Sequence, residues 1–476
     1  MADCCTIGSK PNGRYDLAVV GAGSAGFSAA IAAAELGARV ALIGHGTIGG
    51  TCVNIGCVPS KTLIRATEAI HQADAAARFA GVRAQGRIED WRAAIRQKDE
   101  LVSSLRQKKY IDLLPSYDTV AYLEGQARLT AEGVAVNGSL VGAGKVVIAT
   151  GAAPALPPIE GIESVPYLTS TTALELDRLP KSLLVIGGGY VGCELGQMFA
   201  RSGVKVTIAF RTRLLPEAEP EIGEALTGYF RDEGIAVRGA LSYREIRQDS
   251  DGIALSVLAD GAPETLRAEQ VLVATGRKPN TAGMGLAEAG VELLRGGGIK
   301  VDDRMRTSRS GTYAAGDVTG RDQFVYMAAY GARVAAENAL NDDSRRYEAS
   351  TMPAVVFTDP QVASVGLTEA AAREQGLKVR TSVLPLSDVA RALAARDTRG
   401  LIKLIANAHN GKLLGAHILA PEGADSIQTA VLAIKCGLTV EQLAETIFPY
   451  LTTVEGLKLA ALSFTKDVAK LSCCAG

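Results

Sequence analysis

Short apolar runs that end at a glycine recur along this chain. Five of them have strand length, at residues 15–20 (YDLAVV), 145–149 (KVVIA), 182–186 (SLLVI), 271–274 (VLVA) and 312–315 (TYAA). Runs with so little polar alternation are typical of strands that are buried on both faces. Segments with helical patterning lie between them, so the sequence predicts an α/β protein.

The first run begins a strand–helix–strand unit. It is followed by Gly21-Ala22-Gly23-Ser24-Ala25-Gly26, an Ala-rich helix over 27–37 and a second strand over 38–44. Glycines at this spacing allow a tight turn, close approach of the backbone to a pyrophosphate, and close packing of helix on strand. The context predicts a dinucleotide site at Gly21, Gly23, Ser24, Ala25 and Gly26.

One expected feature of this unit is missing. The second strand should end in an acid that holds a ribose hydroxyl, but it ends in Gly44 and His45. Either another group holds the ribose, or the adenosine is held more loosely.

The run at 182–186 begins a second such unit. Gly187-Gly-Gly189-Tyr190-Val191-Gly192 follows it, then a helix over 193–203 and a strand over 205–210. Arg211 and Arg213 come next, and no acid is present. Arginine at this place accommodates a 2′-phosphate, so the sequence predicts NADPH. The alternative is that both arginines are solvated surface residues.

Two dinucleotide sites in one chain predict a hydride relay, with FAD at the first site and the nicotinamide at the second. The run at 312–315 is followed by Gly316 and Asp317, and the Asp317 carboxylate can accept a hydrogen bond from a ribityl hydroxyl of the flavin. The first domain therefore resumes after the second, which is inserted into it. Predicted bounds are 1–152 and 272–346 for the FAD domain and 153–271 for the NADPH domain.

Residues 347–476 combine alternating β runs with helices and contain no glycine phosphate loop. We expect them to form an α+β dimerisation domain. The fold class is thus two Rossmann-like domains, one inserted in the other, plus this third domain. A length of 476 residues is consistent with about three domains.

The segment GGTCVNIGCVPSK, 49–61, places Cys52 and Cys57 shortly after the first unit. Two thiols at this spacing can close a small disulfide ring if their Cα atoms come to about 6 Å. Half of a zinc site and two buried structural thiols are the alternatives. No further ligands at similar spacing follow nearby, and the surrounding loops favour redox use.

Six further cysteines are distributed as Cys4/Cys5, Cys193, Cys436 and Cys473/Cys474. Cys193 and Cys436 lie in predicted helices, and we interpret both as small buried residues. Adjacent cysteines make a strained disulfide but a good soft-metal clamp, so Cys473 and Cys474 are predicted metal ligands. The alternative is an incidental exposed pair. Cys4 and Cys5 are either a remnant of metal capture or part of a disordered end.

Charge and hydropathy exclude several classes of partner. Fifty basic residues face 51 acidic ones, for a net charge of −1, so nothing favours nucleic acid or an anionic membrane. No apolar run reaches the 18 residues of a membrane span, and the start lacks a signal-peptide core. We therefore expect a cytoplasmic protein.

Taken together, GAGSAG, GGTCVNIGCVPSK, VIATG, GGGYVGCE, VATGRKPN and TYAAGD resemble the pyridine nucleotide-disulfide oxidoreductases of the glutathione reductase and dihydrolipoamide dehydrogenase type. The resemblance covers roughly residues 14–470. It implies FAD, a nicotinamide, a homodimer with a shared active site and a redox-active Cys52–Cys57 pair.

The same resemblance assigns roles to individual residues. Cys57 lies nearest the flavin, Cys52 faces the substrate, Tyr190 gates the flavin, and Lys61 and Glu194 form an ion pair beside the flavin ring. The further cofactor-binding residues that it implies are Gly50, Thr51, Thr150, Gly151, Gly276 and Arg277.

Two departures point to one branch of the family. Its thiol reductases carry His-Pro-x-x-x-Glu near the C-terminus, but here Tyr450 and Leu451 stand at the His and Pro positions, five and four residues before Glu455. The four histidines, at 45, 71, 409 and 417, offer no substitute. Reducing a disulfide substrate requires a group that can protonate the leaving thiolate near pH 7, whereas reducing a soft metal ion requires thiolates that bind the ion.

Together with the terminal CCAG, these departures make the sequence similar to the branch of the family that reduces Hg(II). We expect Cys473 and Cys474 to capture Hg(II), from the partner subunit, and to pass it to Cys52 and Cys57 for reduction to Hg(0). Tyr450 is a predicted weak ligand or hydrogen-bond donor. The alternatives are a disulfide or dihydrolipoyl reductase that has replaced its histidine, and a non-catalytic flavoprotein that binds metal or senses redox state.

Overall fold

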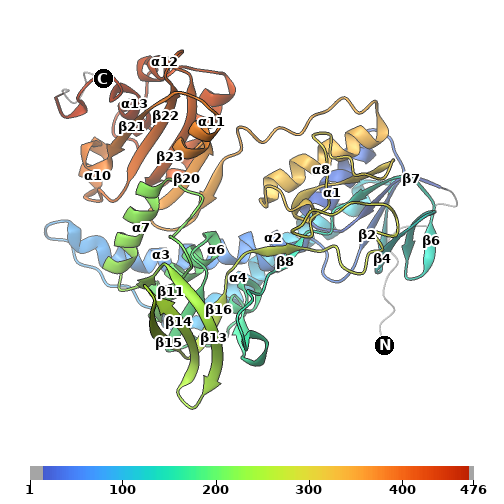
Figure 1. Ribbon diagram of the computed structural model, residues 1–476, viewed down its shortest axis with the longest axis horizontal. Coiled ribbons are helices and arrows are strands. Elements are labelled where there is room, and N and C mark those ends of the chain that lie inside the picture. The colour runs from blue at the N-terminus through green and yellow to red at the C-terminus, as the bar shows by residue number, and fades with distance from the viewer. Residues whose placement is uncertain (1–13, 471–476) are drawn as a thin grey trace. The chain divides into compact units, whose positions relative to one another are not determined.

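The computed structural model describes residues 14–470, without the side chain of Ala469. The chain divides into two compact units. Of the described residues, one unit contains 14–62, 93–155 and 276–349, and the other contains 63–92, 156–275 and 350–470. Figure 1 shows the elements of both. The residue bounds predicted for the three domains stay a prediction.

The first unit is built on a parallel sheet of order β18-β7-β1-β2-β3. The strand bounds are β1 Tyr15–Val20, β2 Val40–Gly44, β3 Val120–Glu124, β7 Ala143–Ile148 and β18 Thr312–Ala314. Helix α1 (Ser24–Glu35) packs against α8 (Val325–Leu340) beside this sheet (Figure 1). Because β18 joins β7 from far along the chain, the inserted second domain is confirmed.

Smaller strands complete the first unit. An antiparallel sheet contains β4 (Ala127–Thr130), β5 (Gly133–Val136) and β6 (Ser139–Val141). A two-stranded ribbon pairs β8 (Ala152–Pro154) with β17 (Arg277–Pro279). The chain thus leaves this unit and returns to it through paired strands.

In the second unit a parallel sheet has the order β12-β11-β10-β16-β9. Its strands are β9 Tyr167–Leu168, β10 Ser182–Ile186, β11 Lys205–Ala209, β12 Ala236–Arg238 and β16 Gln270–Val273. Helix α6 (Tyr190–Arg201) follows the second glycine loop, and α7 (Pro220–Asp232) leads to β12. An antiparallel meander, β13 (Leu241–Asp249), β14 (Gly252–Ala259) and β15 (Ala262–Ala268), lies between β12 and β16.

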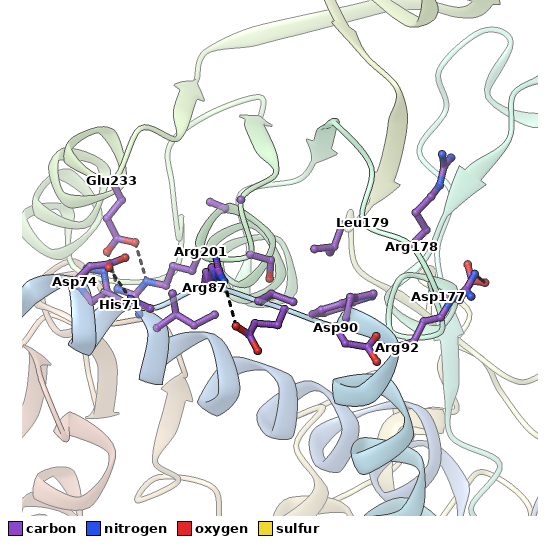
Figure 2. A pocket seen from close by; sticks show the side chains of 18 of the residues that line it. His71, Asp74, Arg87, Asp90, Arg92, Asp177, Arg178, Leu179, Arg201 and Glu233 are labelled. Carbon is purple, nitrogen blue, oxygen red and sulfur yellow. Dashed lines mark hydrogen bonds and ion pairs between the residues drawn. The ribbon is translucent and has the colours of Figure 1, made fainter. Parts of the chain in front are cut away.

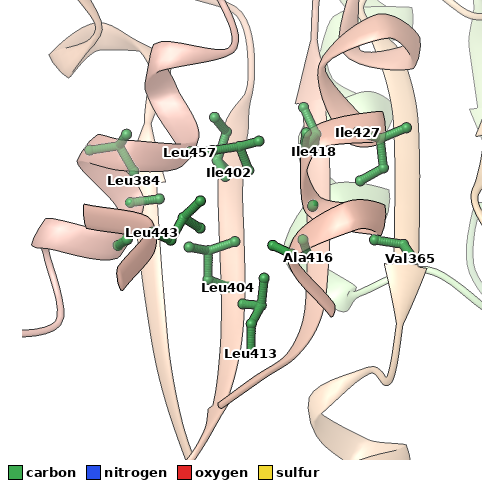
Figure 3. Close-up of a cluster of buried hydrophobic side chains, with 14 of the residues drawn as sticks. Val365, Leu384, Ile402, Leu404, Leu413, Ala416, Ile418, Ile427, Leu443 and Leu457 are labelled. Carbon is green, nitrogen blue, oxygen red and sulfur yellow. The ribbon is translucent and has the colours of Figure 1, made fainter. Parts of the chain in front are cut away.

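The remainder of the second unit is an antiparallel sheet of order β19-β20-β23-β22-β21. Its strands are β19 Ala354–Val356, β20 Gln361–Gly366, β21 Val379–Pro385, β22 Leu401–Asn407 and β23 Leu413–Ala420. Helices α11 (Gly423–Lys435), α12 (Val440–Glu445) and α13 (Glu455–Leu462) surround a buried core that includes Ile402, Ile418 and Leu457 (Figure 3). This sheet and its helices form the predicted α+β domain.

Candidate redox-active site

The two central cysteines lie at the junction of two helices in the first unit. Cys52 lies in the short helix α2 (Gly50–Ile55), and Cys57 is the first residue of α3 (Cys57–Asp74). Gly56 joins them, and a Cβ there would lie 2.9 Å from the Thr51 carbonyl oxygen. Glycine therefore permits the sharp junction that brings the two thiols together.

Both cysteines are half-buried thiols, and they interact directly. A hydrogen bond with Cys57 and burial together raise the pKa of Cys52 far above that of an ordinary thiol. The positive charge of Lys61 acts in the opposite direction. A pair that shares a proton in this way holds one negative charge more readily than two. The arrangement fits a dithiol that can be oxidised to a disulfide and can bind a soft metal ion.

The loop that carries the cysteines is braced by a helix from a distant part of the sequence. The Asn54 amide donates to the carbonyl oxygens of Ile48 and Gly50, both at 2.9 Å. Arg106, the last residue of α4 (Trp91–Arg106), donates in turn to Asn54 Oδ1 at 3.1 Å. Only the Asn between the two cysteines is visible as a local signal, because Arg106 is distant in sequence.

A π-helical turn, Gln107–Ile111, follows α4 and directs Tyr110 inward. The Tyr110 ring meets Phe27 edge-on with centroids 4.8 Å apart, and its hydroxyl lies 3.4 Å from Ser24 Oγ. π-Turns are frequent at functional sites. Tyr110 thus connects the first glycine loop with the segment that carries the cysteines.

The first glycine loop has a backbone that only glycine allows. Gly21 has φ +120°, and a Cβ there would lie 2.2 Å from the Ala149 carbonyl oxygen. A Cβ at Gly26 would lie 1.7 Å from the Gly21 carbonyl oxygen. Helix α1 begins at Ser24 with no side-chain cap, so no capping side chain satisfies its first amides, which can bind an anion. This cradle fits the pyrophosphate of FAD.

Predicted flavin-contacting residues gather at the carboxyl ends of β7 and β18 in the same unit. Thr150 Oγ1 donates to the Asn280 carbonyl oxygen at 2.8 Å, which secures the turn through Gly151. Arg277 Nε lies 3.7 Å from Asp317 Oδ2, too far for a hydrogen bond, and it is buried with no hydrogen-bond partner among residues 14–470; another guanidinium nitrogen donates to the Ala152 carbonyl oxygen. Burial raises the pKa of Asp317, and the charge of Arg277 partly offsets this effect.

The second glycine loop repeats the first within the second unit. Gly187 has φ +125°, and its Cβ would lie 2.3 Å from the Ala274 carbonyl oxygen. A Cβ at Gly192 would lie 2.0 Å from the Gly187 carbonyl oxygen, whereas one at Gly189 would meet no atom within 4 Å. The space beside Gly189 leaves room for a second pyrophosphate.

The two arginines that follow this loop have different surroundings. Arg213 donates to the carbonyl oxygens of Pro216 and Ala218, at 2.5 and 2.7 Å, so its guanidinium braces the chain before α7. Arg211 is exposed. The geometry therefore leaves Arg211 available to a 2′-phosphate and commits Arg213 to the loop.

Two further predicted residues lie in the first turns of α6. Tyr190 is the first residue of the helix, and burial together with the charge of Glu217 raises its pKa to about 12. Glu194 is buried, and its Oε1 accepts a hydrogen bond from the Phe357 amide at 2.9 Å. Lys61 belongs to the other unit, so its predicted ion pair with Glu194 stays a prediction.

The tyrosine at the family's histidine position lies in a turn before α13. Leu451 has φ +60°, and its amide donates to Glu455 Oε2 at 3.1 Å, while the Tyr450 side chain is 46% exposed. The turn therefore presents Tyr450 to the outside of its own unit. Cys473 and Cys474 lie outside the described residues, as do Cys4 and Cys5.

Cys193 and Cys436 have different surroundings. Cys193 is buried, and its thiol lies 3.7 Å from the Gly188 carbonyl oxygen, as predicted for a small buried residue. Cys436 is exposed after α11, so the prediction that it is buried was wrong. The apolar pattern of α11 ends one residue earlier, at Lys435, and Cys436 only caps the helix.

A polar pocket of about 990 Å³ lies elsewhere in the second unit (Figure 2). Four arginines line it, and each is paired with a carboxylate: Arg87 with Glu89, Arg92 with Asp177, Arg178 with Glu269, and Arg201 with Glu233. The pocket contains none of the predicted site residues. Because each of these four arginines already has a carboxylate partner, the pocket is not arranged to bind an anion.

Within residues 14–470, no group of three or more His, Cys, Asp or Glu side chains is arranged to hold a metal ion. Among the same residues, none of the helices combines the length and the apolar character that crossing a membrane requires.

Family models identify the class of protein. Residues 15–336 match the pyridine nucleotide-disulphide oxidoreductase model, and residues 352–461 match the dimerisation domain of the same family. The chain belongs to the pyridine nucleotide-disulphide oxidoreductase family. FAD and a nicotinamide dinucleotide are the cofactors that this family implies.

Individual relatives narrow the comparison. A mercuric reductase of Streptomyces lividans is 48% identical over 97% of this chain and 98% of its own length. A mercuric reductase of Lysinibacillus sphaericus is also 48% identical, over 97% of this chain and 85% of its own. Among solved structures, the flavoprotein disulfide reductase RclA of Escherichia coli matches with a TM-score of 0.84 at 31% identity, covering 95% of this chain and all of the other.

Proposed function

We propose that this chain is an NADPH-dependent mercury(II) reductase that uses FAD and the Cys52–Cys57 pair. The observation that carries the proposal is the pair of interacting, half-buried thiols beside a flavin cradle, in a chain with no histidine at the family's acid–base position. Relatives at 46–48% identity over nearly the whole chain, all mercuric reductases, support the choice of substrate.

The chain's own residues account for binding of the two cofactors. The loop at Gly21–Gly26 offers amides to the pyrophosphate of FAD, and that at Gly187–Gly192 to the pyrophosphate of NADPH. Arg211 is free to contact the 2′-phosphate, and Tyr190 stands at the first turn of α6, where the family resemblance expects the gate. Bound FAD supplies the relay that turns the hydride of NADPH into an electron pair for the Cys52–Cys57 disulfide.

Thiolate exchange accounts for the handling of Hg(II). Cys473 and Cys474 of one subunit would bind the ion first, and Cys52 and Cys57 of the partner subunit would then replace them. Two Hg–S bonds form as two break, so the free-energy change of each exchange is small and the ion is never released. A second NADPH would supply the electron pair that reduces Hg(II) to Hg(0). Both Hg–S bonds break as the ion takes up this pair, and Cys52 and Cys57 are left as thiolates.

The absence of an acid–base histidine fits this chemistry. A disulfide substrate leaves as a thiolate that needs a proton, whereas Hg(0) needs none. Tyr450 stands exposed at that position, and we propose that it contacts the metal in the partner's site as a weak ligand or hydrogen-bond donor. Dimerisation through residues 352–461 would bring it there.

The test is Hg(II)-dependent oxidation of NADPH in excess thiol. The parent should be active, and in Cys52→Ser the rate should fall at least about a thousandfold. The double variant Cys473→Ala/Cys474→Ala should lose most of the activity with Hg(II) that is bound to thiols. Cys436→Ala, which removes an exposed cysteine that has no proposed role, is the matched control and should have the activity of the parent. If the parent instead reduces disulfides, such as that of lipoamide, but not Hg(II), the chain is a disulfide reductase.

A further inference from the structure

The first dinucleotide site lacks the acid that ordinarily ends its second strand, and the structure shows what occupies that place. Strand β2 ends at Gly44, and a Cβ added there would lie 2.6 Å from the Tyr122 hydroxyl oxygen and 2.7 Å from the Ala22 Cβ. Any side chain at position 44 would therefore begin inside the volume that these two groups fill. The Tyr122 hydroxyl stands where an acid side chain would start.

The neighbouring strand β3 supplies this hydroxyl and a carboxylate next to it. In the parallel register, Leu42 lies opposite Tyr122 and Gly44 opposite Glu124, and the Gly125 amide donates to the Gly44 carbonyl oxygen at 2.8 Å. Because side chains alternate along a strand, Tyr122 and Glu124 lie on one face. Both are therefore positioned at the carboxyl end of the sheet, beside the glycine loop.

The Tyr122 hydroxyl is available to a ligand. Across residues 14–470, no hydrogen bond joins it to another residue of the chain. The ring is half-buried, and burial followed by the negative charge of Glu124 raises the pKa of Tyr122, so the phenol is neutral at physiological pH. A neutral phenol can both donate and accept a hydrogen bond.

We propose that Tyr122, together with Glu124, holds the adenosine ribose of the FAD bound at Gly21–Gly26, in place of the missing acid on β2. This inference rests on FAD being the cofactor at that loop. A ribose 2′-hydroxyl can donate to the Glu124 carboxylate and accept from the Tyr122 phenol. The adenosine is thus recognised from the strand next to the usual one, and Gly44 is the residue that leaves room for it.

The test measures flavin affinity and requires neither NADPH nor Hg(II). Flavin-free protein is titrated with FAD, with an FAD analogue that lacks the adenosine 2′-hydroxyl, and with FMN, and binding is followed by flavin fluorescence. Tyr122→Phe should bind FAD about fivefold more weakly, as expected for one hydrogen bond, and Glu124→Gln should lose a similar factor. The parent should bind the 2′-deoxy analogue about twenty-five-fold more weakly than FAD, because the analogue loses both of these hydrogen bonds.

The decisive comparison is between the variant and the analogue. If Tyr122 contacts the ribose, Tyr122→Phe and the parent should bind the 2′-deoxy analogue about equally, because the analogue lacks the hydroxyl that Tyr122 contacts, and both should bind FMN alike. Tyr15→Phe, at the opposite end of β1, is the matched control and should not change any affinity. Unfolding temperatures of both variants should match the parent, which separates loss of a contact from loss of the fold.

Two outcomes would overturn the inference. The first is that Tyr122→Phe binds FAD as tightly as the parent does. The second is that the substitution weakens binding of the 2′-deoxy analogue by the same factor as binding of FAD. Either result would show that Tyr122 does not contact the ribose. The proposed function would survive either result. A parent that binds no FAD would overturn both the proposed cofactor and this inference.

Discussion

The two glycine loops of this chain share a backbone but end in different side chains. At their first glycines, φ is +120° at Gly21 and +125° at Gly187, and each added Cβ would overlap the carbonyl of a neighbouring strand, at 2.2 and 2.3 Å. At their last glycines, the overlap is with the first glycine's own carbonyl. These features belong to the backbone, so they cradle a pyrophosphate without distinguishing one dinucleotide from another.

The ends of the second strands differ. In the first unit Gly44 makes room for Tyr122, next to Glu124. In the second unit the Phe210 ring fills the space beside Gly188 and Gly239, where added Cβ atoms would lie 2.8 and 2.5 Å from it, and Arg211 follows exposed. One end offers a hydroxyl and an acid, which suit a ribose, and the other a cation, which suits a phosphate. Selection between dinucleotides therefore resides in a few side chains on a common backbone.

The largest expected effect tests the shared backbone. Gly26→Ala and Gly192→Ala would place a Cβ 1.7 and 2.0 Å from a main-chain carbonyl oxygen. Backbone cannot move aside as a flexible side chain can, so each variant should lose about 3 kcal/mol or more of stability. Thermal unfolding and flavin content are the measurements.

Matched alanine variants in the same loops should be mild. A Cβ at Gly23 would approach no atom closer than 3.4 Å, and one at Gly189 would meet nothing within 4 Å. Gly23→Ala and Gly189→Ala should fold as the parent does. If Gly26→Ala or Gly192→Ala had the same unfolding temperature as these controls, the conclusion that both loops require glycine at their last position would be wrong.

The next effect separates the two arginines. Arg211→Gln should raise the KM for NADPH about tenfold to a hundredfold and leave NADH unchanged, because only NADPH carries the 2′-phosphate. Arg213→Gln should lower stability and affect both nucleotides equally, since it removes bonds to Pro216 and Ala218. Steady-state kinetics with both nucleotides make the distinction. A selective loss in Arg213→Gln alone would reverse the assignment.

A smaller effect compares the two adenosine ends directly. Gly44→Ala and Gly239→Ala each bring a Cβ into an aromatic side chain, Tyr122 and Phe210 respectively, and the Cβ at position 44 also lies 2.7 Å from the Ala22 Cβ. The rings can shift, whereas the Ala22 Cβ moves only with its backbone, so we expect about 2 kcal/mol of destabilisation for Gly44→Ala and about 1 kcal/mol for Gly239→Ala. Gly44→Ala should weaken FAD binding and spare NADPH, and Gly239→Ala should do the reverse. Titration of each variant with both cofactors is the measurement, and equal losses of both would show that the ends are not independent.

The sequence predicts this backbone well because the glycine loops are local signals. Both strand–loop–helix units, the α/β class and the inserted second domain are predicted from runs that lie next to one another. The second unit's strand β11 ends at Ala209, one residue before the predicted end at Phe210, whose ring packs beside Gly188 instead.

Contacts between distant segments could not be predicted in the same way. The loss of an acid at Gly44 is visible in the sequence, but Tyr122 lies 78 positions later. The bond from Arg106 to Asn54 likewise joins two residues that no local pattern connects. Such contacts depend on strand order and on where a helix ends, and the π-turn that directs Tyr110 inward has no sequence signal of its own.

The smallest effect concerns the tyrosine of the second loop. Burial and Glu217 raise the pKa of Tyr190 from 10.0 to about 12, so between these values the folded chain keeps a proton that the unfolded chain loses. Stability must therefore fall as pH rises through this window, and Tyr190→Phe should remove that part of the fall. Urea unfolding at pH 9 and pH 11 measures it: the midpoint of the parent should drop slightly more than that of the variant. Equal drops would mean that Tyr190 titrates as an ordinary exposed phenol, and the second loop would then be more open to water than its geometry indicates.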